Sequence, residues 1–250
     1  MRCSRSQNLK LLLSNLQLFG RARTGRNMFS NPLFDNRADA GERLAAAVFA
    51  EIEKLNLTAP EAVKPIVYAL PRGGLPIAVP IARLLGCPLD VVVAKKITRP
   101  DNPEYALGAV TADGHVIWQK QKPRNFRFQT LALQQAQDKA QSLLADLDPG
   151  CPNVSAAGAL AILVDDGIAT GMTMAVAAKA LRAQQPAALW ICVPVAPEDL
   201  LEFLEEMCDR AIVLEAPDPF YSVSRFYGEF PQVETEEVLM CLRQQSEWRS

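Results

Sequence analysis

The stretch "AILVDDGIATGMT", residues 161–173, decides the fold of this chain. Its apolar start shows no polar alternation, which is typical of a strand buried on both faces of a sheet. The strand ends abruptly at two adjacent carboxylates, Asp165 and Asp166, and the residues that follow are mostly too small to pack in a core. Paired charge followed by small side chains predicts a ligand site at the end of this strand.

The rest of the chain repeats an alternation of buried strands and helices. Apolar runs predict further strands at 66–70, 89–94, 188–195 and 210–215, and helical spacing predicts helices at 38–55, 75–85, 173–184, 197–207 and 235–245. Strands without polar alternation, separated by helices, indicate a parallel sheet that is covered on both faces. The sequence therefore predicts an α/β fold, with a largely parallel central sheet flanked by helices in a Rossmann-like arrangement.

Three segments depart from that alternation. Asp113 and Gly114 lie between two apolar runs and predict a hairpin with a two-residue turn. Residues 124–148 are rich in Gln and Ala and predict a surface helix. The aromatic residues of 216–232 fit two interpretations, a small hood that stacks on a base or packing in the core.

The domain organisation follows from length and from the first residues. A chain of 250 residues fits one α/β domain with extensions. We expect this domain to span 28–250, because Met28 opens a stretch typical of a domain start. Residues 1–27 are Arg-rich and acid-free, and we expect them to be disordered, either as an organellar targeting peptide or as an upstream extension. The expected location is the cytoplasm, or an organelle if this segment is a transit peptide.

Charge and composition exclude several classes of function. Residues 1–34 hold six of the 26 basic residues, so the remainder carries 20 bases against 28 acids, a net charge of −8. That balance gives no sign of a nucleic-acid partner. No apolar run reaches the ~20 residues that span a bilayer, so we expect no membrane partner. The six Cys are scattered, with no C-x-x-C pair. The single histidine, His115, argues against a His-based metal site and against a Ser-His-Asp triad.

Candidate site residues follow from the ends of the predicted strands. Ligands of open α/β sheets bind beyond the carboxyl ends of the strands. The residues found there are Arg72, Gly73 and Gly74 after the strand at 66–70, and Lys95 and Lys96 after the strand at 89–94. The cations suit phosphates, and the glycines let backbone amides approach an anion closely. A solvated turn at the two lysines and a plain tight turn at Arg72 remain as alternatives.

The loop after the acid pair has the properties of a phosphate cradle. Its small residues leave backbone N–H groups accessible, the following helix adds its positive end, and Thr170 and Thr173 add hydroxyl donors. Two carboxylates beside a phosphate site suit the hydroxyls of a sugar or a hydrated divalent cation. A phosphate site next to a diol site fits a ribose 5-phosphate.

On these residues the chain resembles the type I phosphoribosyltransferase family. "ILVDDGIATGMT" is similar to the phosphoribosyl diphosphate motif of that family, "LPRGG" to its diphosphate loop, and "VVVAKKI" to its strand that ends in basic residues. The resemblance covers about residues 38–232, and the order and spacing of the three motifs make it specific. Within the family, the chain is most similar to a widespread group of uncharacterised members whose acceptors are unassigned.

The resemblance implies a role for each matching residue. Asp165 and Asp166 are expected to bind the ribose hydroxyls directly or through Mg²⁺. The 5-phosphate is expected to be held by Ala169, Thr170, Gly171, Met172 and Thr173. Arg72 and Gly73 are expected to line the diphosphate, commonly through a strained peptide bond, and Lys95 or Lys96 to neutralise the leaving diphosphate. The implied reaction is Mg²⁺-dependent transfer of ribose 5-phosphate from phosphoribosyl diphosphate to a nitrogenous acceptor.

The sequence also departs from the family in informative places. Ala169 occupies a position where relatives acting on 6-oxopurines usually carry an acid, which argues against hypoxanthine or guanine as acceptor. No general base is evident, so a non-catalytic sensor of phosphoribosyl diphosphate or of a nucleotide is the alternative function. Homodimers are common among such relatives, and a homodimer is therefore expected, although no residue here establishes it.

Overall fold

The structure is a computed structural model that describes residues 32–55, 57, 63–99, 102–119 and 126–248. The predictions for residues 1–27 lie outside this part. The helices are α2 (Arg37–Lys54), α3 (Gly74–Leu85), α4 (Phe126–Leu147), α5 (Met172–Ala183), α6 (Leu201–Met207) and α7 (Thr235–Arg243). The strands are β1 (Pro65–Ala69), β2 (Leu89–Val91), β3 (Ala94–Arg99), β4 (Asn102–Thr111), β5 (Val116–Trp118), β6 (Leu160–Val164), β7 (Ala188–Val195) and β8 (Arg210–Glu215).

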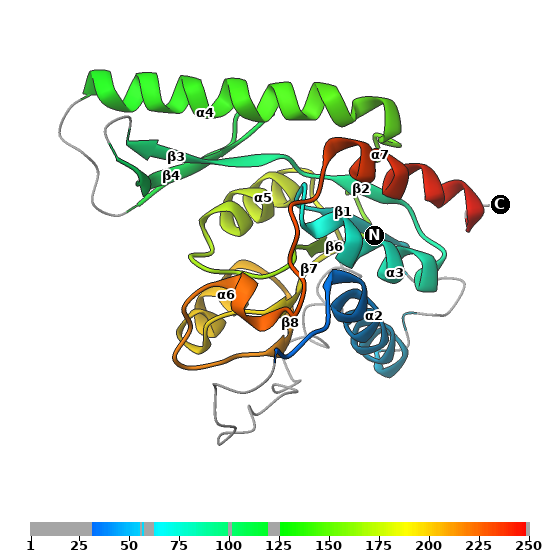
Figure 1. The fold of residues 1–250 in the computed structure, drawn as a ribbon. Coiled ribbons are helices and arrows are strands. Elements are labelled where there is room, and N and C mark those ends of the chain that lie inside the picture. The colour runs from blue at the N-terminus through cyan, green and yellow to red at the C-terminus, as the bar shows by residue number, and fades with distance from the viewer. Residues whose placement is uncertain (1–31, 56, 58–62, 100–101, 120–125, 249–250) are drawn as a thin grey trace, which may run out of the picture.

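The central sheet confirms the predicted fold class. Its five strands are all parallel and run in the order β2-β1-β6-β7-β8. Successive side chains of each strand enter opposite faces of the sheet. Thus Val67 and Ile162 belong to a core shared with α2, α3 and α7, whereas Tyr68 and Leu163 belong to a second core shared with α5 and α6. Figure 1 shows these helices on the two faces of the sheet.

The strand order reverses between β1 and β6. From β1 the chain crosses to β2 on one side, and β6 then pairs with β1 on the other side. Ligands of open α/β sheets bind where the strand order reverses in this way, because the loops leave adjacent strands in opposite directions there. The carboxyl ends of β1 and β6 are tied together by a hydrogen bond from Leu70 N to Val164 O of 2.9 Å.

The second sheet corrects the prediction of one strand over 89–94. The central strand β2 ends at Val91, and a new strand, β3, begins at Ala94 in a separate antiparallel sheet of order β3-β4-β5. Lys95 and Lys96 therefore lie inside an antiparallel strand, and not just beyond the end of a central one. The sequence conceals this break because Val92 and Val93, which lie between the two strands, are apolar and at least half-buried. In Figure 1 this sheet projects from the body beneath the long helix α4.

The predicted hairpin is present, with a longer turn than expected. Val110 pairs with Val116, and Thr111 N donates to His115 O at 2.9 Å, which leaves residues 112–114 in the turn. Gly114 has a φ of 92°, a conformation that glycine adopts without steric cost. A glycine in the left-handed region at the third turn position is a common three-residue hairpin connection.

Candidate active site at the junction of β1 and β6

The acid pair and the loop after β1 are packed directly against each other. A Cβ atom on Gly73 would lie 2.0 Å from Asp166 Oδ2, and a Cβ atom on Gly74 would lie 3.4 Å from Asp165 Oδ1 and 2.9 Å from Val164 O. Any side chain at these two positions would displace the carboxylates or the strand end. The glycines are therefore required by the close approach of Asp165 and Asp166, in addition to any ligand that approaches them.

The 71–74 loop has a defined local structure. The Pro71–Arg72 peptide bond is cis. The Gly74 N–H donates to Leu70 O at 3.0 Å, which closes the turn before α3 begins. The half-buried Arg72 guanidinium lies 3.5 Å from the Glu234 carboxylate at the start of α7. Glu234 thus orients Arg72 at the edge of the crevice. A bound anion would have to compete with Glu234 for the Arg72 guanidinium.

The acid pair is half-buried and carries an electrostatic cost. Burial raises the pKa of Asp165 well above its usual range, and the neighbouring Asp166 charge raises it further. Burial also raises the pKa of Asp166, and the Arg37 guanidinium opposes that rise. The Asp166 N–H donates to Asp165 Oδ1 at 2.9 Å, which orients the first carboxylate. Two desolvated carboxylates held side by side are disfavoured unless a cation or hydroxyl donors join them.

The loop that follows the acid pair ends at a helix whose first turn is open. Gly171 precedes α5 with a φ of 72°, and no side chain caps the helix. The first N–H groups of an α-helix have no partner inside the helix and carry its positive end, which favours an anion. Ala169 and Thr170 are exposed at the tip of the loop, and Thr173 is half-buried in the first turn. This is the arrangement that a phosphate group requires.

Gly167 is small for a different reason from the one that the sequence suggests. A Cβ atom on Gly167 would lie 2.6 Å from Val223 Cγ1 and 2.9 Å from Val195 Cγ1. The absence of a side chain at Gly167 therefore makes room for the protein's own core. Ile168 is also buried, and its N–H donates to Val195 O at 2.9 Å. The accessible part of the loop begins at Ala169.

The two predicted lysines lie on opposite faces of β3. Lys95 pairs with Val110, which packs on α4, and Lys96 pairs with Ala109, which packs against α5. Lys95 is half-buried, and burial together with the positive charges of Arg72 and Lys139 lowers its pKa. Lys96 is exposed. The two lysines therefore lie on opposite faces of β3, and the charge of Arg72 acts on Lys95.

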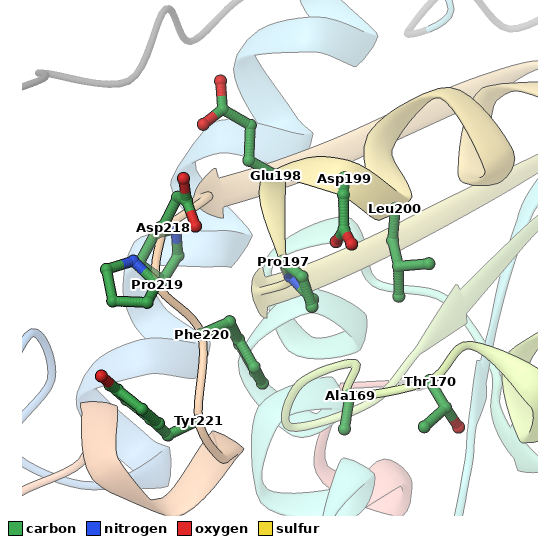
Figure 2. Close-up of a pocket in the computed structure, with 11 residues that line it drawn as sticks. Ala169, Thr170, Pro197, Glu198, Asp199, Leu200, Asp218, Pro219, Phe220 and Tyr221 are labelled. Atoms are coloured by element: carbon green, nitrogen blue, oxygen red, sulfur yellow. The ribbon is translucent and has the colours of Figure 1, made fainter.

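A pocket of about 680 Å³ opens beside the tip of the loop. Its walls come from the segments after β7 and β8 and from the loop itself, namely Ala169, Thr170, Pro197, Glu198, Asp199, Leu200, Pro217, Asp218, Pro219, Phe220 and Tyr221. Figure 2 shows Asp199 and Leu200 pointing to the side where Ala169 and Thr170 lie, whereas Glu198 points away. All three charged groups among these described residues are carboxylates. A ligand here meets a negative, partly apolar wall.

The aromatic segment 216–232 divides between the two expected roles. Phe220 and Tyr221 line the pocket, as a hood would. Tyr227 is buried, with its ring 5.3 Å from Phe34 and 4.9 Å from Phe230, which is core packing. The division falls within the segment because Phe220 and Tyr221 come soon after β8, whereas Tyr227 packs against Phe34, just before α2.

Sequence reasoning missed two residues that contact the acid pair. Arg37, the first residue of α2, is buried and places both Nε and Nη2 2.8 Å from Asp166 Oδ2. The Tyr227 hydroxyl donates to Asp166 O at 2.6 Å. Burial of the Tyr227 side chain raises the pKa of its phenol. Arg37 precedes Asp166 by 129 positions. Its only local signal was a basic residue directly after the helix N-cap Asn36.

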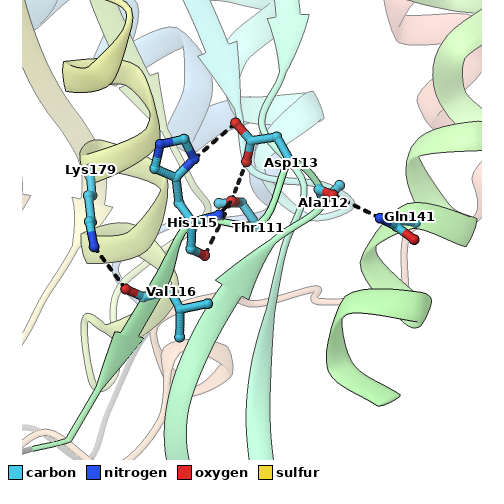
Figure 3. Close-up of polar contacts among 7 residues, drawn as sticks. All are labelled: Thr111, Ala112, Asp113, His115, Val116, Gln141 and Lys179. Atoms are coloured by element: carbon cyan, nitrogen blue, oxygen red, sulfur yellow. Dashed lines mark hydrogen bonds and ion pairs between the residues drawn. The ribbon is translucent and has the colours of Figure 1, made fainter. Parts of the chain in front are cut away.

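The single histidine lies in the hairpin turn of the second sheet. His115 Nδ1 is 3.1 Å from Asp113 Oδ2, and the Thr111 hydroxyl donates to the other oxygen of that carboxylate (Figure 3). Burial alone would raise the pKa of Asp113, but the contacts with Thr111 and His115 together outweigh burial and lower it. Gln141 of α4 and Lys179 of α5 donate to the carbonyls of Ala112 and Val116, so helices on both sides hold the turn. These contacts indicate that His115 stabilises the hairpin turn.

The described residues offer little to a metal except the acid pair. No group of three or more His, Cys, Asp or Glu side chains within the described ranges could enclose a metal ion. Mg²⁺ commonly binds to one or two carboxylates and completes its coordination with water and substrate oxygens. Asp165 and Asp166 fit that open mode. Among the described helices, none is both long and apolar enough to cross a bilayer.

Comparison with known proteins gives a consistent set of relatives. The family described as "Phosphoribosyl transferase domain" matches residues 35–221, a range that begins just before Arg37 and ends at Tyr221 of the pocket. Proteins of two Mycobacterium tuberculosis strains, CDC 1551 and H37Rv, are provisionally named phosphoribosyl transferases and are 33% identical over 214 residues. The match covers 84% of this chain and 46% of each relative, so the chain spans about half their length.

A solved structure matches over nearly its whole length. The crystal structure of a protein from Thermus thermophilus superposes with a TM-score of 0.69 at 32% identity, and covers 87% of this chain and 99% of that one. The similarity to that structure therefore extends over most of the chain.

Proposed function

The chain belongs to the phosphoribosyl transferase domain family, and from that premise we propose that it transfers ribose 5-phosphate from phosphoribosyl diphosphate to a nitrogenous acceptor. The observation that carries this proposal is the close packing of a carboxylate pair, a glycine loop and an uncapped helix at the sheet's switch point. These parts suit a diol, a diphosphate and a 5-phosphate respectively. We name residues 71–74 and 165–173 together the donor site.

In the proposed complex, each part of the donor has its own partner. The amides of the first turn of α5 and the hydroxyls of Thr170 and Thr173 hold the 5-phosphate. Asp165 and Asp166 accept hydrogen bonds from the ribose hydroxyls, and would hold Mg²⁺ together with oxygens of the donor. Bound there, the metal supplies positive charge that offsets the charge of the diphosphate. Arg72 and Lys95 contact the diphosphate from the side of the second sheet.

The chemical step breaks the bond between C1 of the ribose and the diphosphate oxygen, and a nitrogen lone pair forms the new bond to C1. Positive charge develops on the sugar ring, and negative charge develops on the leaving diphosphate. Arg72 and Lys95 stabilise that negative charge, and cations placed in advance at a developing charge commonly provide a large part of catalysis. The acceptor's proton leaves the nitrogen, and Asp199 at the wall of the pocket is the proposed site that receives it.

The pocket is the proposed acceptor site, and its charge narrows the acceptor. Asp199 and Asp218 favour a neutral or cationic acceptor that presents N–H donors, and disfavour one that carries a carboxylate. Phe220 offers an aromatic face to a planar ring. Because Ala169 provides no acid at the loop tip, 6-oxopurines are expected to be poor acceptors.

Two measurements test the proposal in sequence. Isothermal titration with phosphoribosyl diphosphate and Mg²⁺ should show binding, and the double change Asp165→Asn, Asp166→Asn should abolish it while circular dichroism remains unchanged. No heat at millimolar ligand would refute the proposed donor. A panel of nucleobases is then assayed for diphosphate release. Binding without release on any base would instead establish the non-catalytic sensor.

A further inference from the structure

Arg37 makes an unusually complete set of contacts for a residue outside the loops of the donor site. Its Nε and Nη2 atoms both lie 2.8 Å from Asp166 Oδ2, and its Nη1 donates to Pro231 O at 2.7 Å. Its Cζ atom lies 3.6 Å above the Phe230 ring. Only 9% of the residue is exposed. Guanidinium nitrogens, carboxylate and ring thus form one fixed unit.

Arg37 holds the Asp166 carboxylate in one orientation relative to the 71–74 loop. Asp166 Oδ2, the oxygen that Arg37 holds, is also the atom that a Cβ on Gly73 would meet at 2.0 Å. The carboxylate is therefore pressed against the 71–74 loop at one fixed point. On the other side, the Tyr227 hydroxyl donates to Asp166 O, so the backbone of the same residue is also held. Neither contact of Arg37 uses Asp166 Oδ1.

We propose that Arg37 is a positioning residue of the donor site, which acts through Asp166 by fixing its carboxylate against the diphosphate-binding loop so that its second oxygen faces the ribose diol. This inference rests on the proposed function, since it assumes that Asp166 contacts the donor. A buried ion pair is a weak source of stability compared with apolar packing. The position of the pair against Gly73 is therefore better explained by orientation of the carboxylate than by stability alone.

The same helix supplies a matched control. Arg43 also belongs to α2, lies 3.7 Å from Asp39 and 3.8 Å from Glu215, and has its Cζ atom 4.5 Å above the Phe34 ring. Its Nη1 donates to Leu33 O at 2.7 Å. It therefore has the same kinds of partner as Arg37, although its side chain is 43% exposed, and none of its partners belongs to the donor site.

The test compares two probes in four proteins. Affinity for ribose 5-phosphate with Mg²⁺ reports on the acid pair and the phosphate loop together, whereas affinity for inorganic phosphate reports on the phosphate loop alone. Both are measured by titration in the wild type, Arg37→Gln, Arg37→Lys and Arg43→Gln, with a thermal melt of each. We expect Arg37→Gln to weaken ribose 5-phosphate binding about tenfold or more, the effect of ~1.4 kcal/mol, and to leave phosphate binding within about twofold.

The remaining variants separate orientation from structural damage. Arg37→Lys keeps a cation near Asp166 and should recover part of the lost affinity, and Arg43→Gln should bind both probes as the wild type does. Equal affinities for ribose 5-phosphate in Arg37→Gln and Arg43→Gln would overturn the inference while leaving the proposed function intact. Parallel loss of both probes in Arg37→Gln would also overturn it, because the effect would then be general damage. If Arg37→Gln fails to fold, absence of any preferential loss in Arg37→Lys overturns it instead.

The proposed function can fail separately. If the wild type binds inorganic phosphate but gains nothing from the ribose and Mg²⁺ of the larger probe, the acid pair does not bind a diol, and the proposed donor site is wrong along with this inference. If the wild type shows that gain and Arg37→Gln retains it fully, only the role of Arg37 is wrong.

Discussion

The donor site and the pocket beside it are neighbours built in different ways. The donor site consists of close backbone approaches and buried polar contacts, in which a single added Cβ at Gly73 would meet a carboxylate oxygen at 2.0 Å. The pocket is lined largely by the segments after β7 and β8, where Glu198, Asp199, Asp218, Pro219 and Tyr221 are exposed. The donor site is fixed by the packing of the sheet, whereas these exposed side chains of the pocket can change without disturbing that packing. The fold is therefore expected to constrain the proposed donor site more strongly than the proposed acceptor pocket.

The largest expected loss of donor affinity comes from adding a side chain at Gly73, where the 71–74 loop approaches Asp166. Gly73→Ala should weaken binding of phosphoribosyl diphosphate by more than about a hundredfold, the equivalent of ~2.7 kcal/mol, because the new methyl group displaces Asp166. Titration calorimetry measures the loss. Gly158→Ala is the control: its φ of 68° makes the change strained, but nothing lies within 4 Å. It should lower the melting temperature and leave donor affinity intact; a comparable loss of affinity in both variants would count against the steric explanation.

The next effect separates binding from stability. Asp165→Asn should weaken donor binding by about tenfold or more, yet raise the melting temperature, by about 2–4 °C for each kcal/mol gained in a domain of this size. The sign follows from the raised pKa of Asp165. Burial disfavours its charged form, so the ionised group lowers the stability of the fold above its folded-state pKa, and that cost disappears as falling pH protonates it. Asparagine removes the cost and can still accept from the Asp166 N–H.

Melts at several pH values check the electrostatic cause. The gain from Asp165→Asn should be largest at neutral and alkaline pH and should shrink as the pH falls through the raised pKa of Asp165. A variant that is less stable than the wild type at pH 8 would show that the carboxylate contributes more through its hydrogen bond than it costs through burial.

A smaller effect is expected at the edge of the donor site, where the two lysines of β3 provide a comparison. Lys95→Met should weaken donor binding about tenfold, because a hydrogen bond to a charged group commonly contributes about 1.5–3 kcal/mol. Lys96→Met, on the opposite face of the strand, should change it less than about twofold. Because the pKa of Lys95 is lowered, wild-type affinity should begin to fall with rising pH earlier than an ordinary lysine would cause. Equal effects of the two changes would show that Lys95 has no special part.

The smallest effect on the donor is expected in the pocket. Asp199→Asn should leave the affinity for phosphoribosyl diphosphate within about twofold of the wild type, while it raises KM for the acceptor or lowers kcat. The measurement is steady-state diphosphate release with the best base of the panel. Glu198→Gln is the matched control, because that side chain points away from the loop tip in Figure 2. A loss of donor affinity in Asp199→Asn would show that the two regions are not independent.

The sequence predicted the parts of the molecule whose signals are local. The α/β class follows from uninterrupted apolar runs such as 160–164, and the acid pair with its small loop predicts a ligand site at the end of β6, which pairs with β1. The place of Lys95 could not be predicted, because the move from the central sheet to the second one occurs within a run of valines. The role of Gly167 was hidden as well, since Val223 fills its space from more than 50 positions away.

The contacts of Arg37 and Tyr227 were also beyond sequence reasoning. Each reaches Asp166 from a distant part of the chain, and neither carries a motif. A basic residue at a helix start and a tyrosine in an aromatic loop are ordinary features taken singly. Only the packing of α2 and of the segment after β8 around the strand ends brings them to one carboxylate.

The most direct test of the proposed donor site is a crystal structure with phosphoribosyl diphosphate and Mg²⁺. We expect the 5-phosphate within hydrogen-bonding distance of the amides of Met172 and Thr173, the ribose hydroxyls against Asp165 and Asp166, and the diphosphate between the 71–74 loop and Lys95. The pocket beyond β7 and β8 should then remain open beside C1. A donor bound in that pocket, or one whose ribose lies away from the acid pair, would refute the proposed donor site.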